Sequence, residues 1–190
     1  LMVPYFKVLS GKSDITISAR NISERGPGLE GNYRKLHGGL SNIDFLYFHS
    51  DKEYKELYSD QKDKRWAFKY TDKYQLNENV KVEVDWSKAS DSLVLRDISG
   101  EITSIGSERE QYLNQNISIT GEFKNLILKI EQEKNQSLNP LLTNGYEKSP
   151  SVDLSFFKNI GNFLFRENLN ISYFKADALH GFFGIKHSNK

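Results

Sequence analysis

Polar and apolar residues alternate along most of this chain. The clearest case is the segment 79–87. Its apolar positions fall on one face of an extended chain, and they are Val80, Val82, Val84 and Trp86. Its charged positions fall on the opposite face, and they are Lys81, Glu83 and Asp85. Because successive side chains of a β-strand point to opposite faces, this period of two predicts a half-buried strand.

Six further segments follow the same period and predict strands: 14–20, 43–47, 65–70, 116–120, 152–156 and 169–173. A seventh segment, 126–131, is a mixed run. In the segment 65–70, the aromatic positions share one face, and they are Trp66, Phe68 and Tyr70. Lys69 lies on the other face. No pattern is typical of a long helix, although 51–58 is compatible with one or two helical turns.

The links between these segments differ in length. Short polar links such as 76–79 and 159–162 predict hairpins, and the composition of 25–28 predicts a turn. Three links are longer, and they cover 50–64, 87–109 and 136–150. Long and short links therefore tend to alternate. At roughly ten residues for a strand with its link, we expect an all-β antiparallel meander of about eight or nine strands.

Two kinds of protein have this period. In a soluble sandwich the apolar face is the core and the polar face is solvated. In an outer-membrane barrel the apolar face meets lipid and the polar face lines the lumen. Aromatic residues near strand ends, full charges on the polar faces and the alternation of link lengths favour the barrel. Each of these features also occurs in soluble β proteins, so the period leaves both open.

Composition narrows the classes of function. The chain has 190 residues and a formal net charge of +1, from 26 Lys and Arg against 25 Asp and Glu. This balance argues against nucleic-acid binding through bulk charge, because neutralising phosphates requires a basic excess. No segment approaches the roughly 20 consecutive apolar residues of a membrane-spanning helix. Aromatic residues make up 13% of the chain beside a hydrophobic total of 37%, which suits the interfacial girdles of a barrel.

The sequence offers no recognisable catalytic or metal chemistry. Cysteine is absent, so no disulfide, thiolate ligand or cysteine nucleophile lies within these residues. The four histidines have no ligand spacing, and they are His37, His49, His180 and His187. No Ser/His/Asp grouping or glycine-rich phosphate loop is present. We therefore expect neither an enzyme nor a bound cofactor or metal.

Several local motifs, in order and at similar spacing, resemble the barrel region of the lipopolysaccharide-assembly outer-membrane family, LptD. They are Val3-Pro4-Tyr5-Phe6, Asp14-Ile15-Thr16-Ile17, Ser23-Glu24-Arg25-Gly26, Ser50-Asp51-Lys52-x-Tyr54, Arg65-Trp66, Asp85-Trp86-x-Lys88-x-Ser90-Asp91, Arg96-Asp97 and Pro150-x-Val152-Asp153-Leu154-Ser155. Each is weak alone, but their order is moderately specific. The resemblance covers about 1–177.

The resemblance implies a fold and a task. Residues 1–190 are expected to form part of a large β-barrel in the Gram-negative outer membrane, without the family's N-terminal periplasmic domain and closing strands. The family's barrel is plugged by a lipoprotein, LptE, receives lipopolysaccharide from periplasmic bridge proteins through the N-terminal domain, and places it in the outer leaflet. The implied partners are therefore an LptE-like plug, lipopolysaccharide, the bridge proteins and outer-membrane lipid, with no nucleic acid.

The resemblance also gives residues a role. Pro4 matches a family proline that weakens the seam between first and last strands, so that the barrel opens sideways as a lateral gate; the alternative is a proline on an ordinary edge strand. The lumen-facing candidates are Lys69, Lys81, Glu83 and Asp85. The lipid-facing candidates are Trp66, Phe68, Tyr70, Val80, Val82, Val84 and Trp86. The charged link 50–64 is either a surface loop that binds cations or sugar, or simply solvated.

Two other functions stay open at this point. One is a soluble or secreted all-β binding module, and the other is another outer-membrane barrel such as a porin. Geometry separates the first from the barrel. A single continuous sheet with an uncovered valine face at Val80, Val82 and Val84 favours the barrel, whereas a second sheet packed on those valines excludes it.

Overall fold

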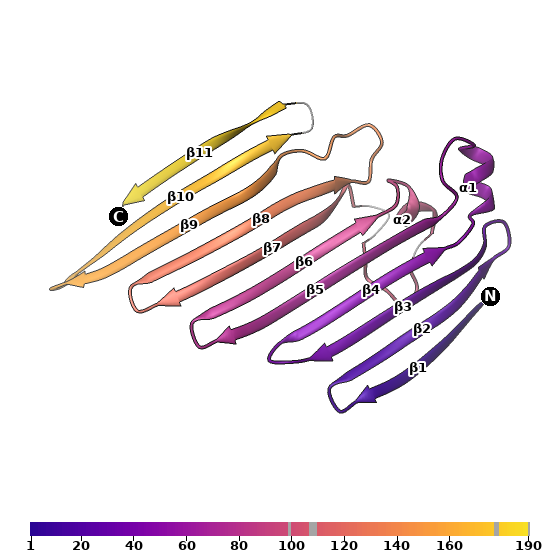
Figure 1. The fold of residues 1–190 in the computed structure, drawn as a ribbon, viewed down its shortest axis with the longest axis horizontal. Helices are drawn as coiled ribbons and strands as arrows, with labels where there is room; N and C mark the ends of the chain where they lie inside the picture. Colours follow the sequence, from indigo (N-terminus) through magenta and orange to yellow (C-terminus); the bar gives the residue numbers. More distant parts are fainter. Residues whose placement is uncertain (99, 107–109, 177–178, 190) are drawn as a thin grey trace.

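The computed structural model describes residues 1–98, 100–106 and 110–176, together with the backbone of 179–189. All the described strands belong to one antiparallel sheet, in which each strand pairs with its neighbours in sequence. The strands run diagonally across the long axis of the sheet (Figure 1). In chain order they are β1 (Met2–Ser10), β2 (Ser13–Ile22), β3 (Gly26–Leu36), β4 (Leu40–Phe48), β5 (Arg65–Asn77), β6 (Val80–Ala89), β7 (Tyr112–Phe123), β8 (Leu126–Ser137), β9 (Glu147–Ile160), β10 (Phe163–Ala176) and β11 (Leu179–Asn189).

The links divide between the two ends of the sheet. At one end all the connections are short turns, such as 78–79 between β5 and β6 and 124–125 between β7 and β8. At the other end lie the three long links, 49–64, 90–111 and 138–146. This alternation confirms the pattern expected from the sequence. We call the two ends the short-turn end and the long-link end.

Two short helices occur in the described part of the chain, and both lie in long links (Figure 1). In α1 (Lys52–Leu57), the side chain of Asp51 accepts a hydrogen bond from the backbone N–H of Tyr54 at 3.0 Å, which caps the helix N-terminus. The short helix compatible with 51–58 is therefore present. The second, α2 (Val94–Asp97), packs near β5. Neither helix has the length and apolar character needed to cross a membrane.

The strand pairing sorts side chains into a polar and an apolar face. One row across β6 to β10 consists of Glu83, Ser118, Glu131, Ser151 and Ser172. The neighbouring row on the opposite face consists of Val82, Ile119, Ile130, Val152 and Ile171. We call these the polar face and the apolar face. All the strands lie in one sheet, so no second sheet covers the valines within the described residues.

The buried core lies at the long-link end of the polar face. Residues of the link 90–111 pack there against the ends of four strands, and the cluster consists of Leu46, Phe48, Ala67, Ala89, Val94, Leu95, Ile98, Ile105 and Leu113. The apolar side chains of this link are thus buried against the sheet itself rather than between two layers. The rest of the polar face carries no comparable cluster among the described residues.

The sheet has eleven strands, more than the eight or nine expected from periodicity. The clearest addition is β3, whose first residues Gly26, Pro27 and Gly28 were expected to form a turn; the turn occupies 23–25 instead. Glycines are accommodated in β3 because aromatic rings fill their places. A Cβ on Gly28 would lie 2.6 Å from the ring of Phe48, and one on Gly31 would lie 2.4 Å from the ring of Phe45.

Candidate transport surface

The four residues predicted to face a lumen lie together on the polar face. Lys69 lies in β5, whereas Lys81, Glu83 and Asp85 follow one another along β6. Pairing aligns Asp85 with Asn116 and Lys81 with Thr120, so the charged row continues into polar neighbours. Lys81 lies 3.9 Å from Glu122, and Glu83 lies 3.8 Å from Lys73. In contrast, Oδ1 of Asp85 is buried without a hydrogen-bond partner among the described residues.

The seven residues predicted to face lipid lie together on the apolar face. Tyr70 pairs with Trp86, and the rings of Trp66 and Phe68 stack with centroids 5.9 Å apart. The three valines of β6 are half-buried. On β7, Val82 lies opposite Ile119 and Val84 lies opposite Ile117, whereas Val80 lies opposite a glycine. The assignments of this face to lipid and of the polar face to a lumen stay predictions.

An arginine at the start of β5 connects two of the long links. Arg65 is fully buried, and its guanidinium binds Asp51 at 3.0 Å, Asp91 at 2.7 Å and Asp97 at 3.0 Å. Asp51 belongs to the first long link, and the other two carboxylates belong to the second. The ring of Tyr54 lies 4.0 Å from the guanidinium carbon. A single side chain thus holds both links at the same corner of the sheet, in the geometry that favours arginine over lysine.

The carboxyl group of Asp91 shows how this corner is charged. Burial alone would raise the pKa of Asp91. Arg65 lowers this pKa through its hydrogen bonds and its positive charge, and hydrogen bonds from Ser90 and the backbone of Leu93 lower it further. Together these interactions outweigh burial, so the pKa of Asp91 is lowered. Asp91 is therefore ionised at neutral pH. Arg25 adds a second positive charge, 2.8 Å from Asp51. The corner is a network in which each buried charge has partners of opposite sign.

A second anchor holds the link 90–111 against the polar face. The carboxylate of Glu30 is fully buried, and its Oε1 accepts hydrogen bonds from the backbone N–H groups of Glu101, Ile102 and Thr103 at 2.7, 2.8 and 3.0 Å. The Thr103 hydroxyl donates to the same oxygen at 2.9 Å, and Arg20 donates to Oε2 at 3.0 Å. Three successive backbone donors on one carboxylate fix the path of this segment across the sheet.

Pro4 lies in β1, which pairs only with β2 among the described strands. Leu1 and Asn21 exchange both backbone hydrogen bonds, at 3.0 and 2.8 Å. Such pairs alternate with non-hydrogen-bonded pairs along an antiparallel ladder, so Pro4, opposite Ser18, falls in a non-hydrogen-bonded pair. Its nitrogen therefore points to the open edge of β1, where proline removes one donor that an incoming strand would use.

The described residues hold no group of three His, Asp or Glu placed to bind a metal ion. His37 lies 3.2 Å from Asp72 and also contacts the Ser41 hydroxyl, whereas His49 lies 3.2 Å from the hydroxyl of Tyr47. The side chains of His180 and His187 lie outside the described residues.

Sequence reasoning did not single out Glu30 or the charge network of Arg65. Several members stood inside the quoted motifs, but those motifs were used for family resemblance and not for contacts. The available signal was that Arg65 begins a predicted strand directly after the long link 50–64, and that Asp51 lies near the start of the same link. Glu30 had no such signal, because the three backbone groups that donate to it lie more than 70 residues away.

Comparisons with known proteins show which family this chain resembles. The family model for LPS transport system D, LptD, matches residues 63–181. The LPS-assembly protein LptD of Ectopseudomonas mendocina is 24% identical over 155 residues, which are 81% of this chain and 16% of that protein. That of Salmonella paratyphi A is 26% identical over 160 residues, or 83% of this chain and 20% of the relative.

The chain thus spans no more than about a fifth of the length of these relatives. Among solved structures, the outer membrane channel DcaP of Acinetobacter baumannii aligns with a TM-score of 0.43 and 9% identity, over 99% of this chain and 60% of that chain. The family model covers more than half of the chain, and four of the eight motifs quoted above lie within the matched residues, from Arg65-Trp66 onwards. The chain belongs to the LptD family, LPS transport system D, of outer-membrane proteins.

Proposed function

We propose that this chain forms part of the wall of an outer-membrane β-barrel that transports lipopolysaccharide and assembles it in the outer leaflet. The protein acts by conduction and release and not by catalysis. The observation that carries the proposal is the separation of the two faces, which continues across consecutive strands from β6 to β10. A barrel in lipid needs such a separation, since only the outward face meets hydrocarbon.

In this orientation the polar face lines the lumen and the apolar face contacts lipid. Lys69, Lys81, Glu83 and Asp85 then meet water and the glycan of the substrate. The link 90–111 lies inside the lumen, where Glu30 and Arg65 hold it. Long links are extracellular in barrels of this class, so the long-link end faces the cell exterior.

Release through the wall would involve β1. Its Pro4 nitrogen points to the open edge, so an additional strand pairing there makes one hydrogen bond fewer. We propose that this edge is one side of a lateral gate. The family resemblance adds an LptE-like plug lipoprotein in the lumen and periplasmic bridge proteins that deliver lipopolysaccharide through a domain outside this chain.

Photocrosslinking at neighbouring positions tests the orientation. A photoreactive residue is placed at position 68 or at position 69 of the full-length protein in cells, because Phe68 and Lys69 are adjacent but lie on opposite faces. We expect position 69 to crosslink to lipopolysaccharide only while export is active, and position 68 to crosslink to membrane lipid whether or not export runs. The same crosslinks at both positions would contradict the proposal.

A further inference from the structure

Three strands end in the same way on the apolar face. Towards the long-link end, β6 reads Val84, Trp86, Lys88; β8 reads Ile130, Gln132, Lys134; and β10 reads Ile171, Tyr173, Lys175. In each strand, three successive side chains of this face are an aliphatic residue, an aromatic or amide residue and a lysine. Along a wall that spans a membrane, this is the order of hydrocarbon, interface and headgroup.

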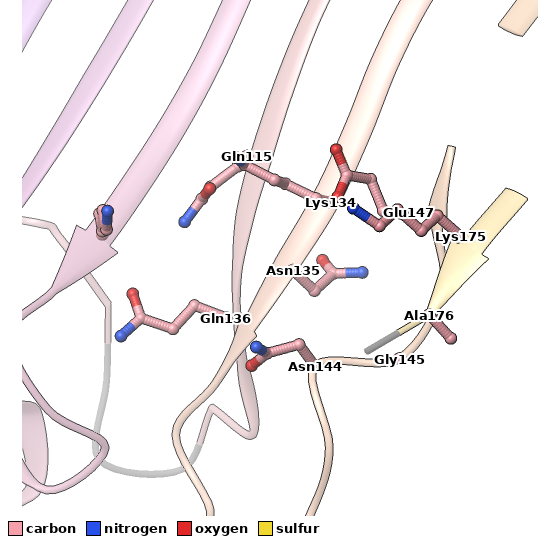
Figure 2. Close-up of a pocket in the computed structure, with 10 residues that line it drawn as sticks. Gln115, Lys134, Asn135, Gln136, Asn144, Gly145, Glu147, Lys175 and Ala176 are labelled. Carbon is pink, nitrogen blue, oxygen red and sulfur yellow. The ribbon is translucent and has the colours of Figure 1, made fainter. Parts of the chain in front are cut away.

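The three lysines line one pocket. It has a volume of about 350 Å³, and its lining residues come from β6 to β10 and from the link 138–146. In Figure 2, Gln115, Lys134, Glu147 and Lys175 form one row, with Asn135, Gln136 and Asn144 below them in the view. Pairing explains the row: Gln115 lies opposite Lys134, and Glu147 lies opposite Lys175. We call this the rim pocket.

The pocket exists because β6 and β7 separate near it. Their pairing ends at Trp86 and Gln115, and the side chain of Gln136 fills the gap beyond. The Gln136 amide accepts from the backbone N–H of Ala89 at 2.9 Å and donates to the Ala89 carbonyl at 2.8 Å. On the opposite wall, Asn144 accepts from the backbone N–H of Ser137 at 2.8 Å. The walls are therefore fixed by hydrogen bonds that do not involve the lysines.

Within the described part of the chain, the lysines of the rim pocket have no ion pairs of the kind that other lysines of the sheet have. Lys129 and Lys148 lie 2.7 and 2.5 Å from glutamates on the polar face. By contrast, none of the rim-pocket ammonium groups has a carboxylate of a described residue within 4 Å, the limit for an ion pair. The ammonium of Lys134 instead lies 5.1 Å from the centre of the Trp86 ring. Among the described residues that line the pocket, three lysines are accompanied by one carboxylate, Glu147, so this lining carries a net positive charge.

We infer that the rim pocket binds the phosphate of a lipid headgroup in the outer leaflet. Lysines are common phosphate ligands, the amide side chains supply neutral donors for sugar or phosphate oxygens, and the volume suits a phosphorylated sugar more than a whole lipid. The acyl chains of the same lipid would then lie on the apolar face below Trp86. This inference rests on the proposed function, in which the apolar face meets lipid and the long-link end is extracellular.

Native mass spectrometry of the purified full-length protein tests the assignment. The probes are phosphorylated lipid A, its dephosphorylated counterpart and inorganic phosphate, and the variants are Lys134→Gln and Lys175→Gln. We expect each variant to weaken binding of the phosphorylated lipid by about tenfold, the usual effect of losing one charge-assisted contact. The variant Glu147→Gln should tighten it. Lys158→Gln is the matched control, because Lys158 lies in β9 opposite Phe165, on the same face near the short-turn end.

The outcomes separate this inference from the function on which it rests. Equal binding of the two lipids, or no effect of either lysine variant, would overturn the rim pocket as a lipid site. Lysine-dependent binding of inorganic phosphate without lipid would overturn it too. The orientation is read independently from quenching by spin-labelled lipids, as the difference between the wild type and Trp86→Phe. Quenching of Trp86 without lysine-dependent binding contradicts only the inference, whereas absence of quenching contradicts the proposed orientation itself.

Discussion

The carboxylate of Glu30 on β3 accepts a hydrogen bond from the backbone N–H of Thr103, and the two residues are 73 positions apart in the chain. Glu30→Ala removes this acceptor and those for Glu101 and Ile102 at once. We expect the amides of 101–103 to exchange hydrogen much faster, because no other acceptor replaces a buried carboxylate. Hydrogen exchange with mass spectrometry measures this on the membrane-reconstituted protein.

Glu122→Ala serves as the control for Glu30. Its carboxylate is largely exposed and lies 3.9 Å from Lys81, so its loss should leave exchange at 101–103 unchanged. If Glu30→Ala also leaves these amides protected, the apolar side chains of the link hold it in place without the carboxylate.

Replacing Arg65 with lysine should destabilise the long-link corner even though the charge is kept. One ammonium cannot reach Asp51, Asp91 and Asp97 together, so at least one buried carboxylate loses its partner, at a cost of about 3 kcal/mol. The heat-induced mobility shift of the folded protein in gels reports the loss. Arg34→Lys is the comparison, because Arg34 and its partner Asp14 lie on the surface, where such pairs contribute about 1 kcal/mol or less.

The same corner predicts a dependence on pH. The pKa of Asp91 is lowered below its ordinary value of 3.8, so the ionised carboxyl stabilises the fold above that value, and the contribution disappears as pH falls through the lowered pKa. We expect protease resistance of the link 90–111 to stay constant from pH 7 to about pH 4 and to fall below it. Asp91→Asn should remove Asp91's part of this acid transition; an unchanged profile would show that Asp91 does not contribute.

The close approach of Phe48 to Gly28 predicts coupling between these residues. Gly28→Ala places a methyl group in the space of the Phe48 ring and should destabilise the fold by about 1–3 kcal/mol. A second substitution, Phe48→Leu, should reduce the effect of Gly28→Ala, because the smaller side chain leaves room for the methyl. Thermal unfolding of the four proteins in the cycle measures the coupling energy, and strict additivity would contradict the contact.

The gate proposal predicts that Pro4→Ala impairs export in the full-length protein. Alanine restores a donor at the open edge of β1, which should strengthen pairing with a strand that lies there. The readouts are surface lipopolysaccharide and sensitivity to large hydrophobic antibiotics. Lys7→Pro is the matched contrast, since the Lys7 N–H is directed at β2 and its loss should destabilise the hairpin without closing the gate. Unchanged export in Pro4→Ala would make Pro4 an ordinary edge proline.

The strands were predictable from the sequence where every second side chain is apolar. The alternation in 79–87 placed β6 with both of its faces, because the period of two depends only on the strand itself. β3 was hidden, since its glycines have no side chains to show a period and their places are filled by Phe45 and Phe48 from the next strand. A local sequence pattern cannot show that the space beside a glycine is filled by a side chain from another strand.

The charged corner was only partly visible in the sequence. Family resemblance drew attention to Asp51, Asp91 and Asp97, but their common partner emerges only when two links meet at Arg65. The rim pocket was hidden for a similar reason: Lys88, Lys134 and Lys175 are far apart in sequence, and only strand order and register bring them to one level.

The link 90–111 also has a consequence for the order of assembly. Every strand pairs with a neighbour in sequence, so the sheet can grow one hairpin at a time with little loss of chain entropy at each step. The hydrogen bonds from 101–103 to Glu30 are of a different kind, because they span more than 70 residues. We expect them to form after β3 to β6 have paired, so that docking of 101–103 on Glu30 marks a completed stretch of the wall.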